Sequence, residues 1–193
     1  MFKQLFVLLF KMIAESTQAW KLLSEKQDKD NEHFYRSYLF PIVGIIALLS
    51  FIGVLIDHSF DVHVLQRVLK TVIKQVIIYG GSFYIMSHIL SEYVFPRFNL
   101  PKDKLHAEQF TGYGSALIYA IAMVKALFPG LFLLEILVFY TIYILWAGAV
   151  QFLKINEDQI IKFTIFAGII ILITPFLLDM LIDLLMPGMK TQP

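Results

Sequence analysis

Residues 110–153 read FTGYGSALIYAIAMVKALFPGLFLLEILVFYTIYILWAGAVQFL, two long apolar segments separated by Pro129-Gly130. Each segment is close to the roughly 20 residues that a helix needs to cross about 30 Å of hydrocarbon. Proline and glycine in sequence favour a tight turn. The stretch therefore predicts two membrane-spanning helices joined as a hairpin.

The first of these helices opens with closely spaced small residues. Gly112, Ala116 and Ala120 recur every four positions, so they share one helical face, and Ser115 lies beside them. In lipid, small residues at this spacing let another helix approach closely. We therefore predict a helix-packing site made of Gly112, Gly114, Ser115, Ala116 and Ala120.

The composition of the whole chain agrees with a membrane protein. Of 193 residues, 58% are hydrophobic and only 16% are charged, and the mean hydropathy is +0.71. Soluble domains are nearer 45–50% apolar and about 25% charged. The formal net charge of +1 argues against a nucleic-acid partner. Because the chain has no cysteine, disulfides, cysteine-based zinc sites and thiol nucleophiles are excluded.

We predict an all-α, polytopic membrane domain of five spans over residues 37–193, preceded by a cytoplasmic or interfacial segment, residues 1–36. The spans are expected near 39–56, 75–95, 109–128, 131–153 and 159–178. The first is entered through Pro41, and the last has a kink at Thr174-Pro175. Strands are not expected, because no alternating pattern occurs and an open sheet cannot be satisfied in lipid.

The first 14 residues are apolar but too short to span. Phe2, Leu5, Phe6, Leu9 and Ile13 fall on one face of a helix. This pattern predicts an amphipathic helix in the membrane interface, with its lysines toward anionic headgroups. A helix packed on the membrane domain is the alternative, and both interpretations stay open here.

Lysine and arginine positions predict the orientation. With the N-terminus in the cytoplasm, the inner segments carry most of the 16 Lys and Arg residues, as the positive-inside rule requires. An odd number of spans then places the C-terminus outside.

Several short stretches resemble the Yip family, small membrane proteins named for their interaction with Ypt/Rab GTPases. Residues 110–115 (FTGYGS) are similar to the Gly-Tyr-rich opening of the family's third span. Residues 140–148 (YTIYILWAG) are similar to its aromatic-rich fourth span, which ends in a glycine. Residues 154–159 (KINEDQ) resemble the turn before the last span in bacterial members. Residues 16–23 with Trp20, and residues 38–41, are similar to the family's entry segment.

The resemblance implies five spans, a cytoplasmic N-terminus and a short external C-terminus. In eukaryotes it implies vesicle trafficking and Rab contact. The long N-terminal cytosolic region and the acidic Asp-Leu-Tyr-Gly-Pro motif of those members are not found in this sequence. We therefore expect a bacterial member in the cytoplasmic membrane.

The second predicted span carries His88, the one ionisable side chain expected near the middle of the bilayer. On a regular helix it shares a face with Gly81, Tyr84, Ser91 and Glu92, which we expect to point into the bundle. Two interpretations stay open. His88 is either a proton-titrating or ligand-contacting group, or a neutral imidazole hydrogen-bonded to a neighbouring helix.

Two further groups of charged residues are candidates for interactions. Lys125 and Glu135 lie about 6–8 Å to either side of the turn at Pro129-Gly130, so we predict an ion pair across the hairpin. The alternative is that Lys125 extends alone to the headgroups. Near the outer surface, oxygen and imidazole groups form a weak candidate for a divalent-metal site, with a solvated loop as the alternative. Its residues are Asp57, His58, Asp61, His63, Asp179 and Asp183.

No motif for a nucleotide site, a serine-histidine-aspartate hydrolase or a zinc protease occurs, so we expect neither catalysis nor a cofactor. The predicted function is that of a non-catalytic Yip-type membrane protein. It would act as an adaptor or membrane organiser through helix–helix contacts with a membrane-protein partner or in a homo-oligomer. The alternative is a small oligomeric transporter or channel for protons, ions or a small solute that uses the polar second span.

Overall fold

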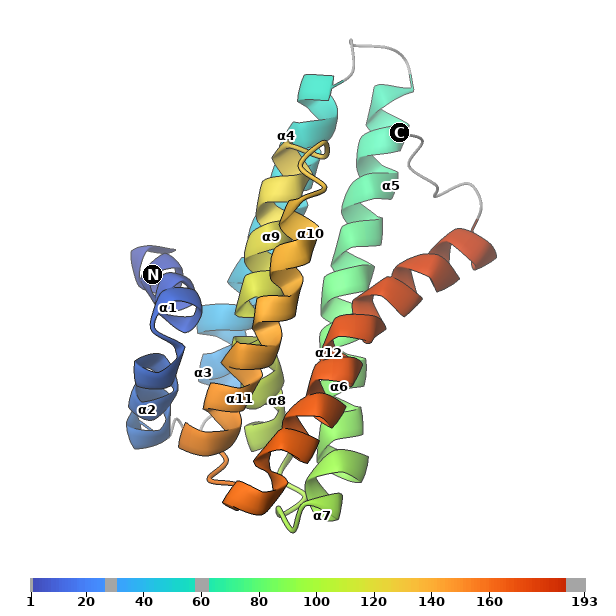
Figure 1. The fold of residues 1–193 in the computed structure, drawn as a ribbon. Coiled ribbons are helices and arrows are strands. Elements are labelled where there is room, and N and C mark those ends of the chain that lie inside the picture. The colour runs from blue at the N-terminus through green and yellow to red at the C-terminus, as the bar shows by residue number, and fades with distance from the viewer. Residues whose placement is uncertain (1, 27–30, 58–62, 187–193) are drawn as a thin grey trace.

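The computed structural model describes residues 2–26, 31–57 and 63–186, and every regular element within these ranges is helical (Figure 1). The predicted all-α class is therefore confirmed. Three helices in the described residues are long and apolar enough to cross a membrane: Tyr35–Ile56, Leu134–Gln151 and Glu157–Leu185. A fourth is added if the bent pair Lys104–Gly114 and Ala116–Leu127 counts as one span.

After the N-terminal helices, two long helical runs form an antiparallel pair. One run joins α3 (Asn31–Phe34), the π-helical η1 (Tyr35–Leu39) and α4 (Phe40–Asp57). The other joins α5 (Val64–Val76), η2 (Ile77–Gly81), α6 (Ser82–Ile89), η3 (Leu90–Val94) and α7 (Phe95–Arg97), with π turns at η2 and η3. The second run begins at Val64, well before the expected start of the second span near residue 75.

Pro41 lies inside the first helical run and not at its entry. Proline has no N–H and disturbs the regular hydrogen-bond ladder. The π turn just before it shifts the pattern by one residue, so that the Phe40 N–H donates to the Tyr35 carbonyl oxygen. The helix thereby continues through Pro41 and starts earlier than the sequence suggested.

The hairpin predicted from residues 110–153 is present, but its first arm is bent. α8 (Lys104–Gly114) and α9 (Ala116–Leu127) meet at Ser115 with a bend of 45°. The turn at Pro129-Gly130 then leads into α10 (Leu134–Leu137), the 3-10 turn η4 (Val138–Tyr140) and α11 (Thr141–Gln151). The straight span predicted over 109–128 is thus two helices.

Asp103 starts α8 by accepting a hydrogen bond from the His106 N–H at 3.2 Å. The His106 ring nitrogen Nδ1 lies 2.7 Å from the other carboxylate oxygen. Burial by itself would raise the pKa of the Asp103 carboxyl, but the hydrogen bonds from His106 outweigh it and lower that pKa below its ordinary value. The side chain therefore caps the helix in its charged form.

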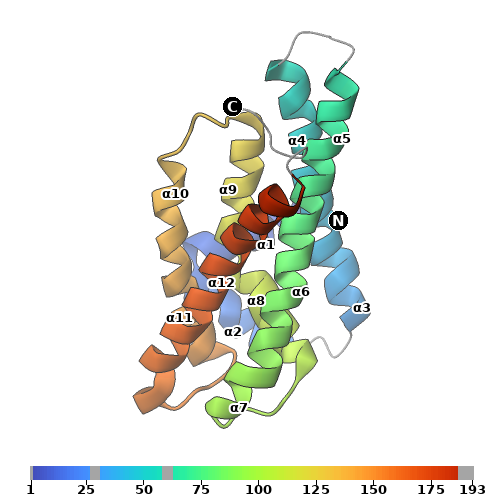
Figure 2. The same cartoon turned by 90° about the vertical axis from the view of Figure 1, so that its right-hand side faces the viewer.

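The last helix, α12 (Glu157–Leu185), continues through Pro175 without a break. The Thr174 hydroxyl donates to the Ile170 carbonyl oxygen at 2.6 Å next to the proline. α12 crosses the bundle obliquely, and its C-terminal half comes beside α5 (Figure 2). We call the end of the bundle that holds the α7–α8 and α11–α12 turns the proximal end. The end that holds the α9–α10 turn is the distal end.

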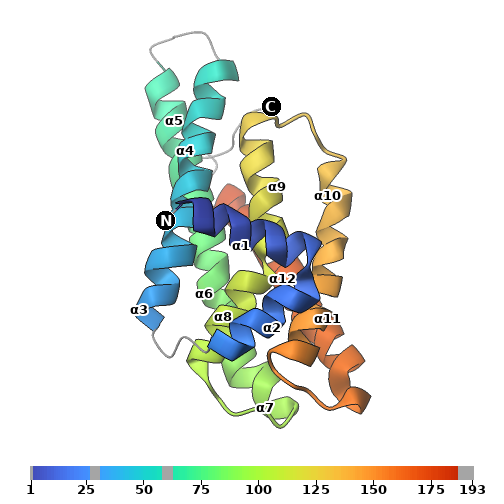
Figure 3. The ribbon, with the colours of Figure 1, turned by 90° about the vertical axis from the view of Figure 1, so that its left-hand side faces the viewer.

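The N-terminal helices α1 (Phe2–Ala14) and α2 (Ser16–Lys26) pack against the bundle side, with α1 lying across α9 (Figure 3). Leu5, Leu9 and Met12 are buried in this contact. Trp20 is fully buried and donates its indole N–H to the Ile144 carbonyl oxygen at 2.9 Å. The structure therefore shows α1 packed on the bundle, as the second alternative predicted.

α8 lies at the centre of the packing. Every side chain from Ala107 to Gly114 is buried. A Cβ at Gly112 would lie 2.5 Å from the Phe34 ring, and one at Gly114 would lie 2.6 Å from Leu145. The glycines of the predicted small-residue site thus pack against helices of the same chain, and Ala116 of that site is fully buried as well.

Candidate functional site

A pocket of about 410 Å³ opens on the side of the distal half, between α9–α10 and the crossing α12. Its walls are mostly apolar, with Ile118, Ile121, Leu172 and Phe176 among them. Five polar side chains also line it: Gln75, Tyr79, Lys125, Glu135 and Asp179. Apolar walls with a few convergent polar groups are the usual composition of a binding site. We call this feature the lateral pocket.

One charged pair in the lateral pocket was predicted from the sequence. The Lys125 ammonium contacts the Glu135 carboxylate across the α9–α10 turn, so the predicted ion pair is confirmed. The side chain of Lys125 is 34% exposed and that of Glu135 is 61% exposed. Exposed pairs are screened by solvent and stabilise a fold only modestly.

We expect Lys125→Glu and Glu135→Lys each to lower the free energy of unfolding by up to about 1 kcal/mol, since each places like charges together. The double reversal should recover most of the loss, because the pair is restored in the opposite sense. Denaturant unfolding of the four proteins in one detergent measures the cycle. Additive losses in the double variant would contradict a direct interaction.

A second charged cluster stands beside the lateral pocket and was not predicted. The Lys74 ammonium lies 2.8 Å from an Asp179 carboxylate oxygen and 2.6 Å from one of Asp183. The Lys74 side chain is only 7% exposed, whereas the two carboxylates are 46% and 32% exposed. One cation facing two anions leaves the cluster with one negative charge in excess. Because Asp179 also lines the lateral pocket, this excess negative charge lies at the pocket wall.

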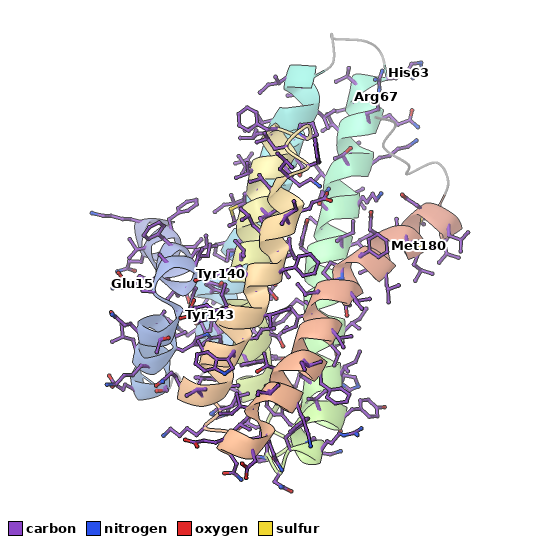
Figure 4. The ribbon with its side chains drawn as sticks, viewed as in Figure 1. Glu15, His63, Arg67, Tyr140, Tyr143 and Met180 are labelled. Carbon is purple, nitrogen blue, oxygen red and sulfur yellow. The ribbon has the colours of Figure 1, made fainter. Side chains whose placement is uncertain are left out.

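The structure describes only part of the outer acidic and histidine-bearing candidate site. Asp179 and Asp183 both contact the Lys74 ammonium of α5. His63 is exposed at the distal end of α5 (Figure 4). His58, Asp61 and the side chain of Asp57 lie outside the described residues. Within the described ranges, no three acidic or histidine side chains gather as metal ligands would.

Only part of the face of the second span that was expected to point inward does so. Ser91 is buried, but Tyr84 is 61% exposed and His88 is exposed as well. A π turn holds one more residue than a regular turn, so the face of α6 that carries His88 does not continue through η3 as a regular period predicts. Glu92, at the proximal end, pairs with Lys102 at 2.7 Å. His88 and Tyr84 therefore lie outside the bundle interior.

Sequence reasoning missed a set of buried polar oxygens on α8 and α9. Glu108 Oε2 and the hydroxyls of Thr111, Ser115 and Tyr119 are buried and have no hydrogen-bond partner among the described protein atoms. The intervals of three, four and four residues were a visible signal, since they place these groups on one helical face.

Comparisons with models of protein families, with curated proteins and with solved structures gave no match.

Proposed function

We propose that the chain is an integral membrane protein with five spans, the run Val64–Arg97 supplying the fifth. Polar side chains lower the hydropathy of this run, which is why it is not among the candidate spans. Each of the five helical runs nevertheless has a stretch free of Asp, Glu, Lys and Arg that corresponds to roughly 25–30 Å at 1.5 Å per residue. The flanking pairs are Arg36 and Asp57, Lys74 and Glu92, Glu108 and Lys125, Glu135 and Lys154, and Lys162 and Asp179.

The proposal includes the orientation and the family. Lysine and arginine are concentrated toward the proximal end, which supports a cytoplasmic proximal side and an external distal side. Five spans with this orientation agree with what the Yip resemblance implies. A bacterial cytoplasmic membrane remains our proposed location. Along η4 and α11, the rings of Tyr140, Tyr143 and Trp146 follow one another at the surface, with centroids 5.2 and 6.0 Å apart; Figure 4 labels the two tyrosines.

Within this frame we propose a non-catalytic adaptor that binds a membrane-embedded partner at the lateral pocket. The observation that carries this function is the lateral opening itself. The small residues of α8 and α9 are used in packing within the chain, so they leave no free row for a partner. A helix of a second membrane protein fits the apolar walls, and a basic or amide side chain on it would suit the excess carboxylate charge near Asp179.

The test uses photo-crosslinking in native membranes. A photoreactive phenylalanine analogue replaces Phe176, which lines the lateral pocket and is 68% exposed. The matched control replaces Phe132, which is 69% exposed but does not line the pocket. We expect a defined protein adduct from position 176 only. Lipid adducts alone at position 176, or the same products at both positions, would contradict the adaptor.

A further inference from the structure

One face of α8 and α9 continues from buried polar groups into the lateral pocket. It carries Glu108, Thr111, Ser115, Tyr119, Ala122 and Ala126, spaced by three or four residues throughout. The first four have unpaired buried oxygens, and the two alanines line the pocket. We call the first four residues the polar stripe.

Two oxygens of the polar stripe lie beyond the reach of the carbonyl oxygens of their own helix. Serine and threonine hydroxyls in helices often donate to a carbonyl one turn earlier, as Ser16 does to Met12 at 2.7 Å. The Tyr119 hydroxyl and Glu108 Oε2 are too far along their side chains for such a bond. A buried polar group without a partner costs about 1–3 kcal/mol. Internal water is the usual partner for such groups.

The spacing along the polar stripe suits single water molecules. Residues four apart on a helix are separated by about 6 Å along its axis. Two hydrogen bonds of about 2.8 Å through one water cover nearly the same distance. One water between Thr111 and Ser115 would join their hydroxyls, and the Ser115 and Tyr119 side chains are close enough to interact directly, so a continuous line of hydrogen bonds would be complete.

Both ends of the polar stripe reach accessible groups. At the proximal end, Glu108 Oε1 lies 3.6 Å from the exposed Lys104 ammonium on the same helix. Tyr35 of η1 also approaches this carboxylate, and the Lys104 ammonium sits 5.7 Å from the ring centroid of Tyr84 on α6. At the other end, the rings of Tyr119 and Tyr79 meet edge to face with centroids 6.2 Å apart. Tyr79 lines the lateral pocket.

We propose that the polar stripe holds a single file of water that conducts protons between the proximal end and the lateral pocket. A proton that binds the Glu108 carboxylate from the proximal solution is matched by one released into water of the pocket. Each hydroxyl and water on the way accepts one proton and gives up another, so only O–H bonds break and form. The electrochemical gradient drives the transfer, and no other reactant is needed.

The residues next to Thr111 in the chain are tightly packed, which favours protons over larger ions. The ring of Phe110 is fully buried and lies 5.6 Å from the buried ring of Phe163 between centroids. Phe83 is buried as well, and its ring lies close to Gly112. A hydrated metal ion requires a wider passage, whereas a proton needs only a connected line of oxygens. This inference does not rest on the adaptor function, because it concerns the interior of one chain.

The test is proton flux into liposomes that contain the full-length protein, driven by a potassium diffusion potential and read with an internal pH dye. We expect flux above that of protein-free liposomes. Thr111→Val and Tyr119→Phe keep the side-chain shape but remove one hydroxyl each, and should lower the flux at least about tenfold. Glu108→Gln should lower it similarly. Thr174→Val and Tyr143→Phe, which change hydroxyls off the stripe, are the matched controls and should leave it unchanged.

Thermal unfolding of the same variants gives an independent result. If the polar stripe is dry, removing an unpaired hydroxyl relieves a cost and Thr111→Val and Tyr119→Phe melt at higher temperature than the original protein. If water fills the stripe, the hydroxyls are already bonded and the melting temperature stays level or falls. Absence of flux, flux that is equal in all variants, or higher melting temperatures of both stripe variants would each overturn the proposal.

Discussion

Gly53→Ala is expected to lower the free energy of unfolding by about 2–3 kcal/mol, although it adds a single methyl group. Gly53 lies on α4, and a Cβ at this position would collide with the backbone carbonyl oxygen of Ala126 on α9. A backbone group cannot rotate away as a side chain can, so the two helices must separate. Small residues at such crossings are what allow close helix approach in membranes.

Gly44→Ala is the matched control for this prediction. Gly44 lies on the same helix, and a Cβ there would meet no heavy atom within 4 Å. Because alanine is favoured over glycine inside a helix by roughly 0.5–1 kcal/mol, the control should be neutral or slightly stabilising. Denaturant unfolding of both variants in one detergent is the measurement. Equal stabilities of the two variants would show that α4 and α9 do not make this contact.

Lys74→Met is expected to cost about 1–3 kcal/mol of unfolding free energy, because it leaves Asp179 and Asp183 facing each other without a cation. Breaking a fully buried pair costs more, but the two carboxylates are 46% and 32% exposed and solvent offsets part of the loss. The C-terminal half of α12 should also become more accessible to proteases, since this cluster fastens it to α5.

Two variants test the mechanism of that loss. Lys70→Met removes a lysine one turn earlier on α5 and should change the stability by no more than about 0.5 kcal/mol. Adding Asp179→Asn and Asp183→Asn to Lys74→Met removes the stranded charges, so the triple variant should regain most of the stability. If Lys74→Met and Lys70→Met had the same free energy of unfolding, the cluster would have no structural role.

The parts of the fold that were predictable depend on local sequence. The hairpin of residues 110–153 has two uninterrupted apolar arms and a Pro-Gly turn, and these signals act within a few residues of one another. The Lys125–Glu135 pair was predictable for the same reason, because distance from the turn alone brings the two side chains together. The bend at Ser115 has no comparable signal, since it depends on how α8 packs against its neighbours.

The missed features depend on contacts between distant segments. Lys74 of α5 had no predicted partner, because the carboxylates that it contacts come from α12, about 100 residues later in the chain. The inward orientation expected for His88 rested on the polar side chains of its face, but the side of α6 that packs on the bundle carries Phe83, Met86 and Ser87. For the site, the sequence identified Lys125, Glu135 and Asp179 but not the pocket that unites them, because the pocket results from the oblique path of α12.

The π turns also bear on how the chain tolerates changes of length. Each π turn contains one residue more than a regular turn needs. Deleting one residue within Ile77–Gly81 would restore ordinary winding there, because residues five apart across a π turn align nearly as residues four apart do in a regular helix. The flanking residues would keep their faces, so we expect a one-residue gap at this place to leave Ser87 facing the interior and His88 facing outward.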